Sequence, residues 1–313
     1  MKTIILDKPG KISKEIQRVK VLQIINQQER IIKHLNIEDF DVIIINNPSV
    51  SITSGVIKLI KNKEIVFMEG NECIAKIIGI ERKPIFDVYT TLLIKIKESK
   101  YKSRRLAFVF AYGVSINKIK LLRKLNQRRK NSSISTLIKK MKQKCSTLRQ
   151  AKSIDNIRNI EAQIAREYYK ALSYIVKGYN GKRDKKAYDP FNVLLNLTRS
   201  MLRNKIHKIL LKEQINTSIG FLHTQKGKNK PFLSYDFTEL FLHYADAFSI
   251  YCINRNIIKD KDISIEGKLK QNKLKYIFEK YNLKDTNIKI KIDQFINYIE
   301  NKGSFNWVIN REK

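Results

Sequence analysis

The first eighty residues contain short apolar runs of the kind that forms β-strands. These runs are rich in β-branched residues, and turn-forming segments such as Lys8-Pro9-Gly10 and Asn46-Asn47-Pro48 separate them. The spacing of residues 51–61 indicates one helix. The sequence therefore predicts a mostly β domain, residues 1–82. The predicted strands are residues 3–6, 18–25, 42–46, 64–68 and 73–80, the last two forming a hairpin through Glu69-Gly70-Asn71.

Beyond Lys83-Pro84 the apolar positions recur with the period of an α-helix. Residues 103–125 and 157–175 each carry an apolar stripe, and Asp189-Pro190 is a typical helix start with an N-cap and a proline in the first position. A further helix is predicted to open at Asp236. The fold class is therefore α+β, with a small N-terminal mostly-β domain followed by a larger all-α domain, residues 83–313.

Positive charge dominates the chain. Its 313 residues include 63 Lys and Arg against 29 Asp and Glu, a net charge of +34. The segment from Ser99 to Ile154 has 17 bases and no acid, whereas a solvated helix face normally mixes both signs. A thermophilic or AT-rich genome would explain many lysines but not the twofold excess over acids. The charge favours a nucleic-acid partner.

Cysteine and hydropathy patterns exclude several other classes. The three cysteines Cys73, Cys145 and Cys252 are far apart, which argues against a zinc ribbon and a disulfide framework. No uncharged run approaches the roughly 18 apolar residues of a membrane span, and the first apolar run is too short for a signal peptide. We therefore expect a cytoplasmic protein with no membrane partner.

Four polar residues in the second half of the chain are candidate metal-binding or catalytic residues. Glu161 lies beside the apolar stripe of its helix, His223 closes the segment GFLH, and Asp236 and Glu239 share one helix face. One imidazole with carboxylates is a set that favours Mn²⁺ or Mg²⁺ over zinc. Acids in a first helical turn are equally well explained as helix caps, so the spacing alone leaves both interpretations open.

The contexts of these residues, taken in order, resemble the CRISPR adaptation integrases, the Cas-one endonuclease family. The order and spacing match over about 80 residues, and the plan of a β domain before an α domain matches too. The matching residues are Glu161, Ala165, Tyr168 and Tyr169; Asp189, Pro190, Asn192, Leu194 and Leu195; Gly220, Phe221, Leu222 and His223; and Asp236 and Glu239.

This resemblance implies a metal-dependent DNA endonuclease and integrase of CRISPR spacer acquisition. It implies that Glu161, His223 and Glu239 bind Mn²⁺ or Mg²⁺ and carry catalysis, with Asp236 as a further candidate ligand. The implied reaction is direct transesterification, in which the 3′-OH of a short DNA duplex attacks a strand at the CRISPR repeat. Water in place of that hydroxyl gives nuclease activity.

The resemblance also implies partners and DNA contacts. It implies double-stranded DNA as substrate, a homodimer formed through the β domain, and a small bridging protein, Cas-two. Two departures occur, since Leu242 and Thr198-Arg199 stand where the family commonly has Arg and a Gly-Tyr pair. The candidate phosphate contacts are Arg166, Arg199, Lys226, Lys228 and Lys230.

Three alternatives stay open at this point. The chain could be a basic DNA-binding protein without catalysis, in which the acids are only caps. It could be a metal-dependent nuclease unrelated to CRISPR. It could also be a casposon-type transposon integrase, which shares the catalytic domain, although the small β domain favours the CRISPR branch.

Overall fold

The computed structural model describes most of the chain, in two compact units, Met1–Lys83 and Pro84–Lys313. The predicted domain boundary after residue 82 lies one residue before this division. No helix in the described ranges is long and apolar enough to cross a membrane. The described residues are 2–61, 63–69, 72–80, 83–184, 186, 188–224, 230–265, 267–281 and 285–305.

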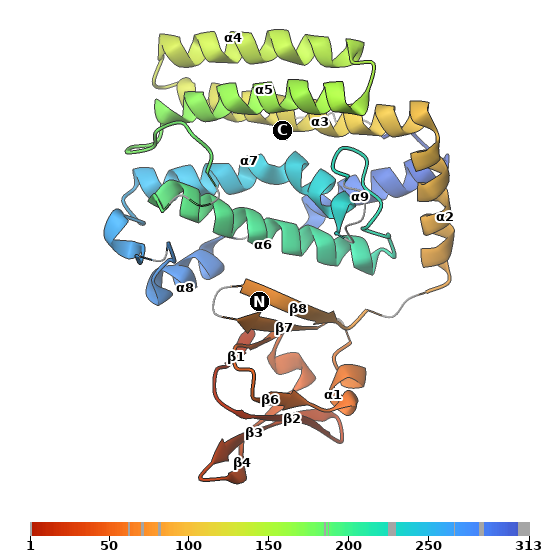
Figure 1. The fold of residues 1–313 in the computed structure, drawn as a ribbon, viewed down its shortest axis with the longest axis vertical. Coiled ribbons are helices and arrows are strands. Elements are labelled where there is room, and N and C mark those ends of the chain that lie inside the picture. Colours follow the sequence, from red (N-terminus) through yellow and green to blue (C-terminus); the bar gives the residue numbers. More distant parts are fainter. Residues whose placement is uncertain are drawn as a thin grey trace. The chain divides into compact units, whose positions relative to one another are not determined.

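The N-terminal unit consists of two four-stranded sheets (Figure 1). In the first sheet, with order β1-β5-β7-β8, the first three strands are parallel and β8 is antiparallel to β7. In the second, with order β4-β3-β2-β6, all pairs are antiparallel except β2 with β6. The elements are β1 Thr3–Leu6, β2 Gly10–Glu15, β3 Arg18–Ile25, β4 Gln28–Asn36, η1 Ile37–Asp39, β5 Val42–Ile45, β6 Val50–Ile52, α1 Ser54–Leu59, β7 Glu64–Glu69 and β8 Glu72–Ile78.

All five predicted strands are present in this unit, and three further strands, β2, β4 and β6, were missed. Gly10 was interpreted as part of a turn but is the first residue of β2. A Cβ at Gly10 would lie 2.2 Å from the carbonyl oxygen of Leu22 on the neighbouring strand, so the glycine permits close strand pairing. Val19, Phe40, Ile43 and other fully buried residues fill the core of the unit.

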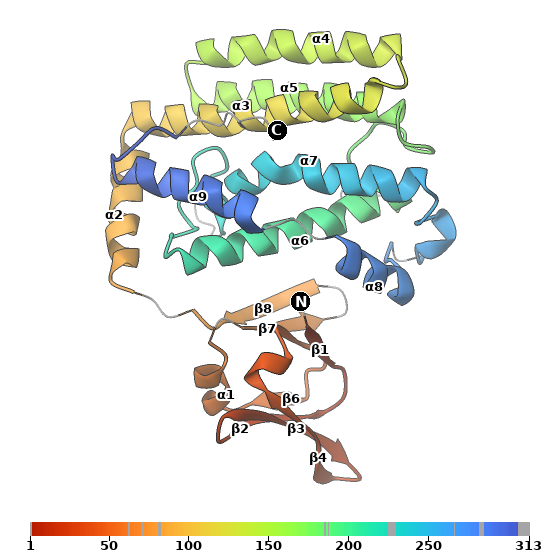
Figure 2. The same ribbon diagram turned by 180° about the vertical axis from the view of Figure 1, so that it is seen from behind.

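The second unit is helical in the residues that the structure describes. α3, α4 and α5 lie side by side, and α7 lies between them and α6 (Figures 1 and 2). Together with the strand-rich first unit, this confirms the predicted α+β fold class. The elements are α2 Ile85–Glu98, α3 Lys100–Asn126, α4 Ser132–Thr147, η2 Leu148–Gln150, α5 Ile154–Ser173, α6 Pro190–Lys212, α7 Phe232–Asn254, η3 Asp260–Asp262, α8 Gln271–Lys280 and α9 Asp285–Ile299.

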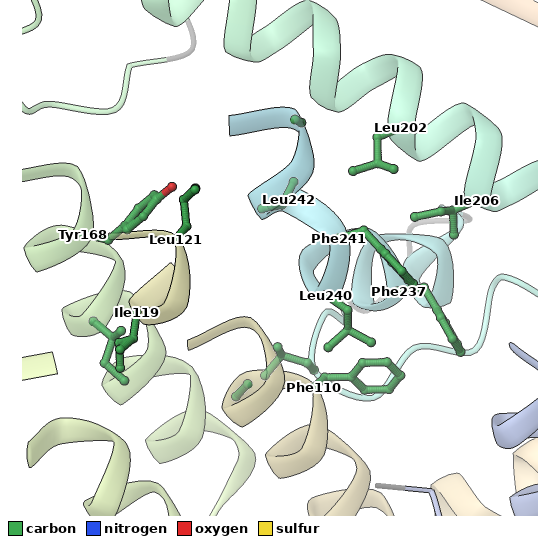
Figure 3. Close-up of a cluster of buried hydrophobic side chains, with 14 of the residues drawn as sticks. Phe110, Ile119, Leu121, Tyr168, Leu202, Ile206, Phe237, Leu240, Phe241 and Leu242 are labelled. Carbon is green, nitrogen blue, oxygen red and sulfur yellow. The ribbon is translucent and has the colours of Figure 1, made fainter. Parts of the chain in front are cut away.

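α3 and α7 form the centre of this unit. The ring of Phe110 on α3 packs against that of Phe237 on α7 in a T-shaped arrangement, with 5.4 Å between ring centroids, and Leu240 lies nearby (Figure 3). α6 begins as predicted, with the Asp189 side chain accepting a hydrogen bond from Asn192 N at 3.0 Å. The predicted start of α7 at Asp236 is wrong, because the helix already begins at Phe232.

Candidate active site

The GFLH segment is a turn organised by one buried carboxylate from α7. Asp236 Oδ2 accepts hydrogen bonds from Phe221 N at 2.6 Å and Leu222 N at 3.0 Å. Asp236 Oδ1 accepts from His223 N at 2.8 Å and lies 2.8 Å from His223 Nδ1. Since a carboxylate is an acceptor, Nδ1 is the donor, and Nε2 is the ring nitrogen that Asp236 does not bind.

Two cations hold the same turn from other helices. Lys97 Nζ on α2 donates to Gly220 O at 2.6 Å, and Arg158 Nε on α5 donates to Leu222 O at 2.6 Å. Gly220 has no room for a side chain, since a Cβ there would lie 2.4 Å from the carbonyl oxygen of His223. Three helices therefore fix the position of His223, whose side chain is 41% exposed.

Glu161 on α5 is paired with a lysine on α3. Its Oε1 accepts a hydrogen bond from Lys118 Nζ at 2.9 Å, and the Lys118 side chain is only 3% exposed. The neighbouring Asn117 donates to Leu240 O of α7 at 2.9 Å. This bond fixes α3 against α7 one residue from Glu239.

The charges of Glu161 and Glu239 act on both His223 and Lys118. Burial would lower the pKa of His223, but the hydrogen bond and charge of Asp236, with the charges of Glu239 and Glu161, raise this pKa above its ordinary value. Burial also disfavours the charged form of Lys118, yet the charges of Glu161 and Glu239 raise the pKa of Lys118. Glu161, Glu239 and the imidazole therefore share one electrostatic neighbourhood.

The donor chemistry of this cluster fits a hard divalent cation. Two carboxylates, together with an imidazole that a third carboxylate orients through Nδ1, are donor groups that suit such an ion. In the described part of the chain, no three His, Cys, Asp or Glu side chains stand ready to surround an ion. Glu161 is paired with Lys118 in this conformation, so ligation requires this carboxylate to be released.

The role predicted for Asp236 changes. Its predicted N-cap role is wrong, because Asp236 lies inside α7 and Pro231 is the N-cap. Each of its carboxylate oxygens already accepts two hydrogen bonds from the turn, and the residue is fully buried. We therefore assign Asp236 to positioning His223, in place of its role as a further candidate ligand.

Arg199 has a structural role that the sequence did not reveal. Its Nε and Nη2 donate to Asp246 Oδ1 at 2.9 and 2.6 Å, and its Nη1 donates to Tyr169 Oη at 2.7 Å. Tyr168 Oη donates to the other oxygen of Asp246 at 2.9 Å. Arg199 is 8% exposed, so its prediction as a phosphate contact is corrected to a buried ion pair that joins α6 to α7.

Two of the other four predicted phosphate contacts lie in the described part of the chain. Arg166 on α5 and Lys230 at the end of the loop are exposed, as a phosphate contact requires. Lys226 and Lys228 lie outside the described residues. These four residues stay predictions.

Sequence reasoning missed a basic cavity and two site residues, Lys97 and Lys118. The cavity has a volume of about 590 Å³ and lies where α2, α3 and the start of α5 meet. The acid-free segment from Ser99 to Ile154 was the available signal, since it contains most of the lining and also Lys118. The lining residues are Lys97, Lys100, Tyr101, Ser103, Arg104, Lys152, Ser153 and Ile154.

Fold and site together define a class of protein. In it a strand-rich unit precedes a helical unit that carries an imidazole oriented by a buried carboxylate, within a strongly basic chain. The model of one family, CRISPR associated protein Cas1, matches residues 4–282. The chain therefore belongs to this family, as the sequence resemblance predicted.

Curated relatives carry the same family name. The chain is 25% identical over 148 residues to the CRISPR-associated endonuclease Cas1 of Clostridium perfringens, which covers 45% of this chain and 44% of the relative. It is 24% identical over 235 residues to that of Hyperthermus butylicus, covering 70% of this chain and 66% of the relative. The matches thus span less than two thirds of each relative.

Solved structures share the fold. A casposase bound to integration product has a TM-score of 0.77 at 19% identity, covering 100% of this chain and 95% of that chain. A Cas6-RT-Cas1–Cas2 complex has a TM-score of 0.75 at 16% identity, covering 99% of this chain and 36% of that chain. At this level of identity the likeness concerns the fold alone.

Proposed function

We propose that this protein is a metal-dependent DNA integrase and endonuclease that inserts short DNA duplexes into a CRISPR repeat array. Membership of the Cas1 family and the endonuclease names of the relatives support this function. The observation that carries it is the turn in which the buried Asp236 orients the ring of His223, whose pKa the charges of Glu239 and Glu161 raise.

In this proposal Glu161, His223 and Glu239 hold the metal, Mn²⁺ or Mg²⁺. When bound, such an ion polarises the scissile phosphate and lowers the pKa of the attacking hydroxyl. Asp236 keeps a proton on His223 Nδ1 and thereby presents Nε2 as the ligand atom. Lys97 and Arg158 keep the turn in place through its carbonyl oxygens.

In the proposed reaction one phosphodiester bond forms as another breaks. The attacking 3′-OH of the incoming duplex gives up its proton to solvent, and its oxygen forms a bond to phosphorus. The phosphorus–oxygen bond of the repeat strand breaks, and the released 3′-oxygen takes up a proton from solvent to become a new 3′-OH. Bases around the cavity between α2, α3 and α5 contact DNA phosphates, with Arg166 and Lys230 as further contacts.

The proposed assembly is a homodimer formed through the strand-rich unit, bridged by the small Cas2 protein on double-stranded DNA. The name of the Cas6-RT-Cas1–Cas2 complex, which shares this fold, supports Cas2 as a partner. Light scattering of the purified protein should give the mass of a dimer, and a monomer at micromolar concentration would contradict the assembly.

A strand-transfer assay tests the proposed activity. A labelled duplex is incubated with a plasmid that carries the repeat array, with and without Mn²⁺. Glu161→Gln, His223→Ala and Glu239→Gln should each abolish label transfer while retaining DNA binding. Glu167→Gln, on the same helix as Glu161 and paired with Lys144, is the matched control and should retain transfer. Undiminished transfer of the label by the first three variants would contradict the proposed site.

A casposon-type integrase is the second candidate, because a casposase shares the fold across the whole chain. The two functions separate on the DNA target. Joining to a repeat-bearing plasmid but not to one with transposon-type terminal repeats supports the CRISPR function, and the reverse supports the casposase. Cleavage without any joining would favour a plain nuclease.

A further inference from the structure

Lys118 is unlike the other lysines of its helix. It is the one lysine in the buried set of the described residues, with 3% of its surface exposed, whereas Lys120 and Lys124 on the same helix are exposed. Its backbone position is fixed by the bond from Asn117 to α7. α3 therefore places one ammonium in the interior, while Lys120 and Lys124 face solvent.

A buried ammonium requires a negative partner, because desolvation of an unpaired charge costs several kcal/mol. Glu161 supplies that partner at 2.9 Å. The ring of Tyr168 supplies further support, with its centroid 5.9 Å from Nζ. The ion pair thus lies inside the cluster in which Glu161 is the proposed metal ligand, rather than on a solvated surface.

The geometry points to Lys118 as the internal counter-cation of this site. It is a positioning residue that holds the Glu161 carboxylate in the metal-free protein and competes with the divalent ion for that carboxylate. This inference rests on the proposed function, because it takes Glu161 as a metal ligand. It also accounts for the finding that no three ligand side chains in the described ranges are preassembled around an ion.

Competition has a direct consequence for metal affinity. An ammonium in contact with Glu161 occupies a donor atom and repels an approaching divalent cation. The ion therefore has to break the Lys118–Glu161 pair before it gains its full ligand set, and this cost weakens binding. Removing the ammonium should make Mn²⁺ bind more tightly, whereas a residue that merely supports the fold would leave metal affinity unchanged or reduced when it is removed.

Isothermal titration of the full-length protein with Mn²⁺ tests this expectation. K118M keeps the length of the side chain and removes its charge, and we expect its Mn²⁺ dissociation constant to fall by about tenfold. K120M removes the same charge from an exposed position of the same helix and should bind as the wild type does. K118R restores a cation and should return affinity toward the wild-type value.

Equal or weaker Mn²⁺ binding by a folded K118M would overturn the inference. If K118M does not fold, thermal unfolding of E161Q and of the double variant K118M/E161Q decides. E161Q leaves Lys118 buried without its partner, so the double variant should unfold at a higher temperature, and no gain over E161Q would also overturn the inference. Failure of the proposed function looks different, since E161Q would then bind Mn²⁺ as well as the wild type does.

Discussion

At the scale of single residues, Asp236 organises the site through its geometry. Each of its oxygens accepts two hydrogen bonds, and the four donors all belong to residues 221–223. The carboxylate is fully buried, so water does not replace a donor or acceptor that is lost. The orientation of the imidazole therefore depends on a residue that is not itself a proposed ligand.

Replacing Asp236 by Asn should destabilise the protein strongly. The amide offers one acceptor oxygen and an NH₂ group that faces donors, so at least one buried N–H is left unpaired. We expect the free energy of unfolding in urea to fall by about 2–4 kcal/mol. Asp155→Asn is the control, because that carboxylate is 82% exposed beside Arg158, and a change below about 0.5 kcal/mol is expected. Similar losses in both variants would contradict the assigned role of Asp236.

His243 on α7 should make stability depend on pH. Burial lowers the pKa of His243 to about 4, partly offset by the charge of Asp246. The unfolded chain takes up this proton near pH 6.5, so the contribution of neutral His243 is present above that pH and is lost as pH falls toward 4. At pH 5 the loss should be about 2 kcal/mol.

Urea unfolding of the wild type and of His243→Gln at pH 7 and pH 5 measures this loss of stability. Other titrating groups act equally in both proteins, so the wild type should lose more stability than the variant by that amount. Equal losses in the two proteins would show that His243 titrates normally in the folded state.

At the scale of elements, the site depends on how α3 packs against α7. The ring of Phe237 contacts those of Phe110 and Phe295, at centroid distances of 5.4 and 5.2 Å, and is fully buried. Phe237→Ala should lower the free energy of unfolding by about 3–5 kcal/mol through loss of apolar burial and the cavity left behind. Phe278→Ala on α8, where the ring is 45% exposed, is the matched control and should cost much less.

The helices could be predicted because their signals are local. Asp189 and Pro190 mark the start of α6 by cap and proline chemistry alone, and this prediction is confirmed. Lys118 could not be found in this way. In the sequence Lys118 is one base in a long basic run. Its burial depends on how α5 and α7 pack against α3, which the sequence pattern of α3 does not specify. The role of Asp236 was likewise hidden, because its partners lie thirteen or more residues earlier across a loop.

At the scale of the whole molecule, the basic residues of the chain occupy different kinds of position. A few bases form internal ion pairs, as Arg199 does with Asp246 and Lys118 does with Glu161. Lys100 and Arg104 instead line the cavity beside Lys97, which also holds the turn of His223. Some bases thus form internal ion pairs while others line the cavity, a distinction that composition alone does not reveal.

The cavity residues should contribute measurably to the salt dependence of DNA binding. Each base that contacts a phosphate releases about one condensed counterion, so the logarithm of the binding constant should fall linearly with the logarithm of salt concentration. Lys100→Ala and Arg104→Ala should each reduce the magnitude of that slope by about 1 for a repeat duplex, measured by fluorescence anisotropy between low and physiological salt. Lys275→Ala removes the same charge from an exposed site on α8 and should leave the slope unchanged, because only phosphate contacts, and not net charge, release counterions. Equal reductions in all three variants would mean that DNA responds to the total charge of the protein rather than to this cavity.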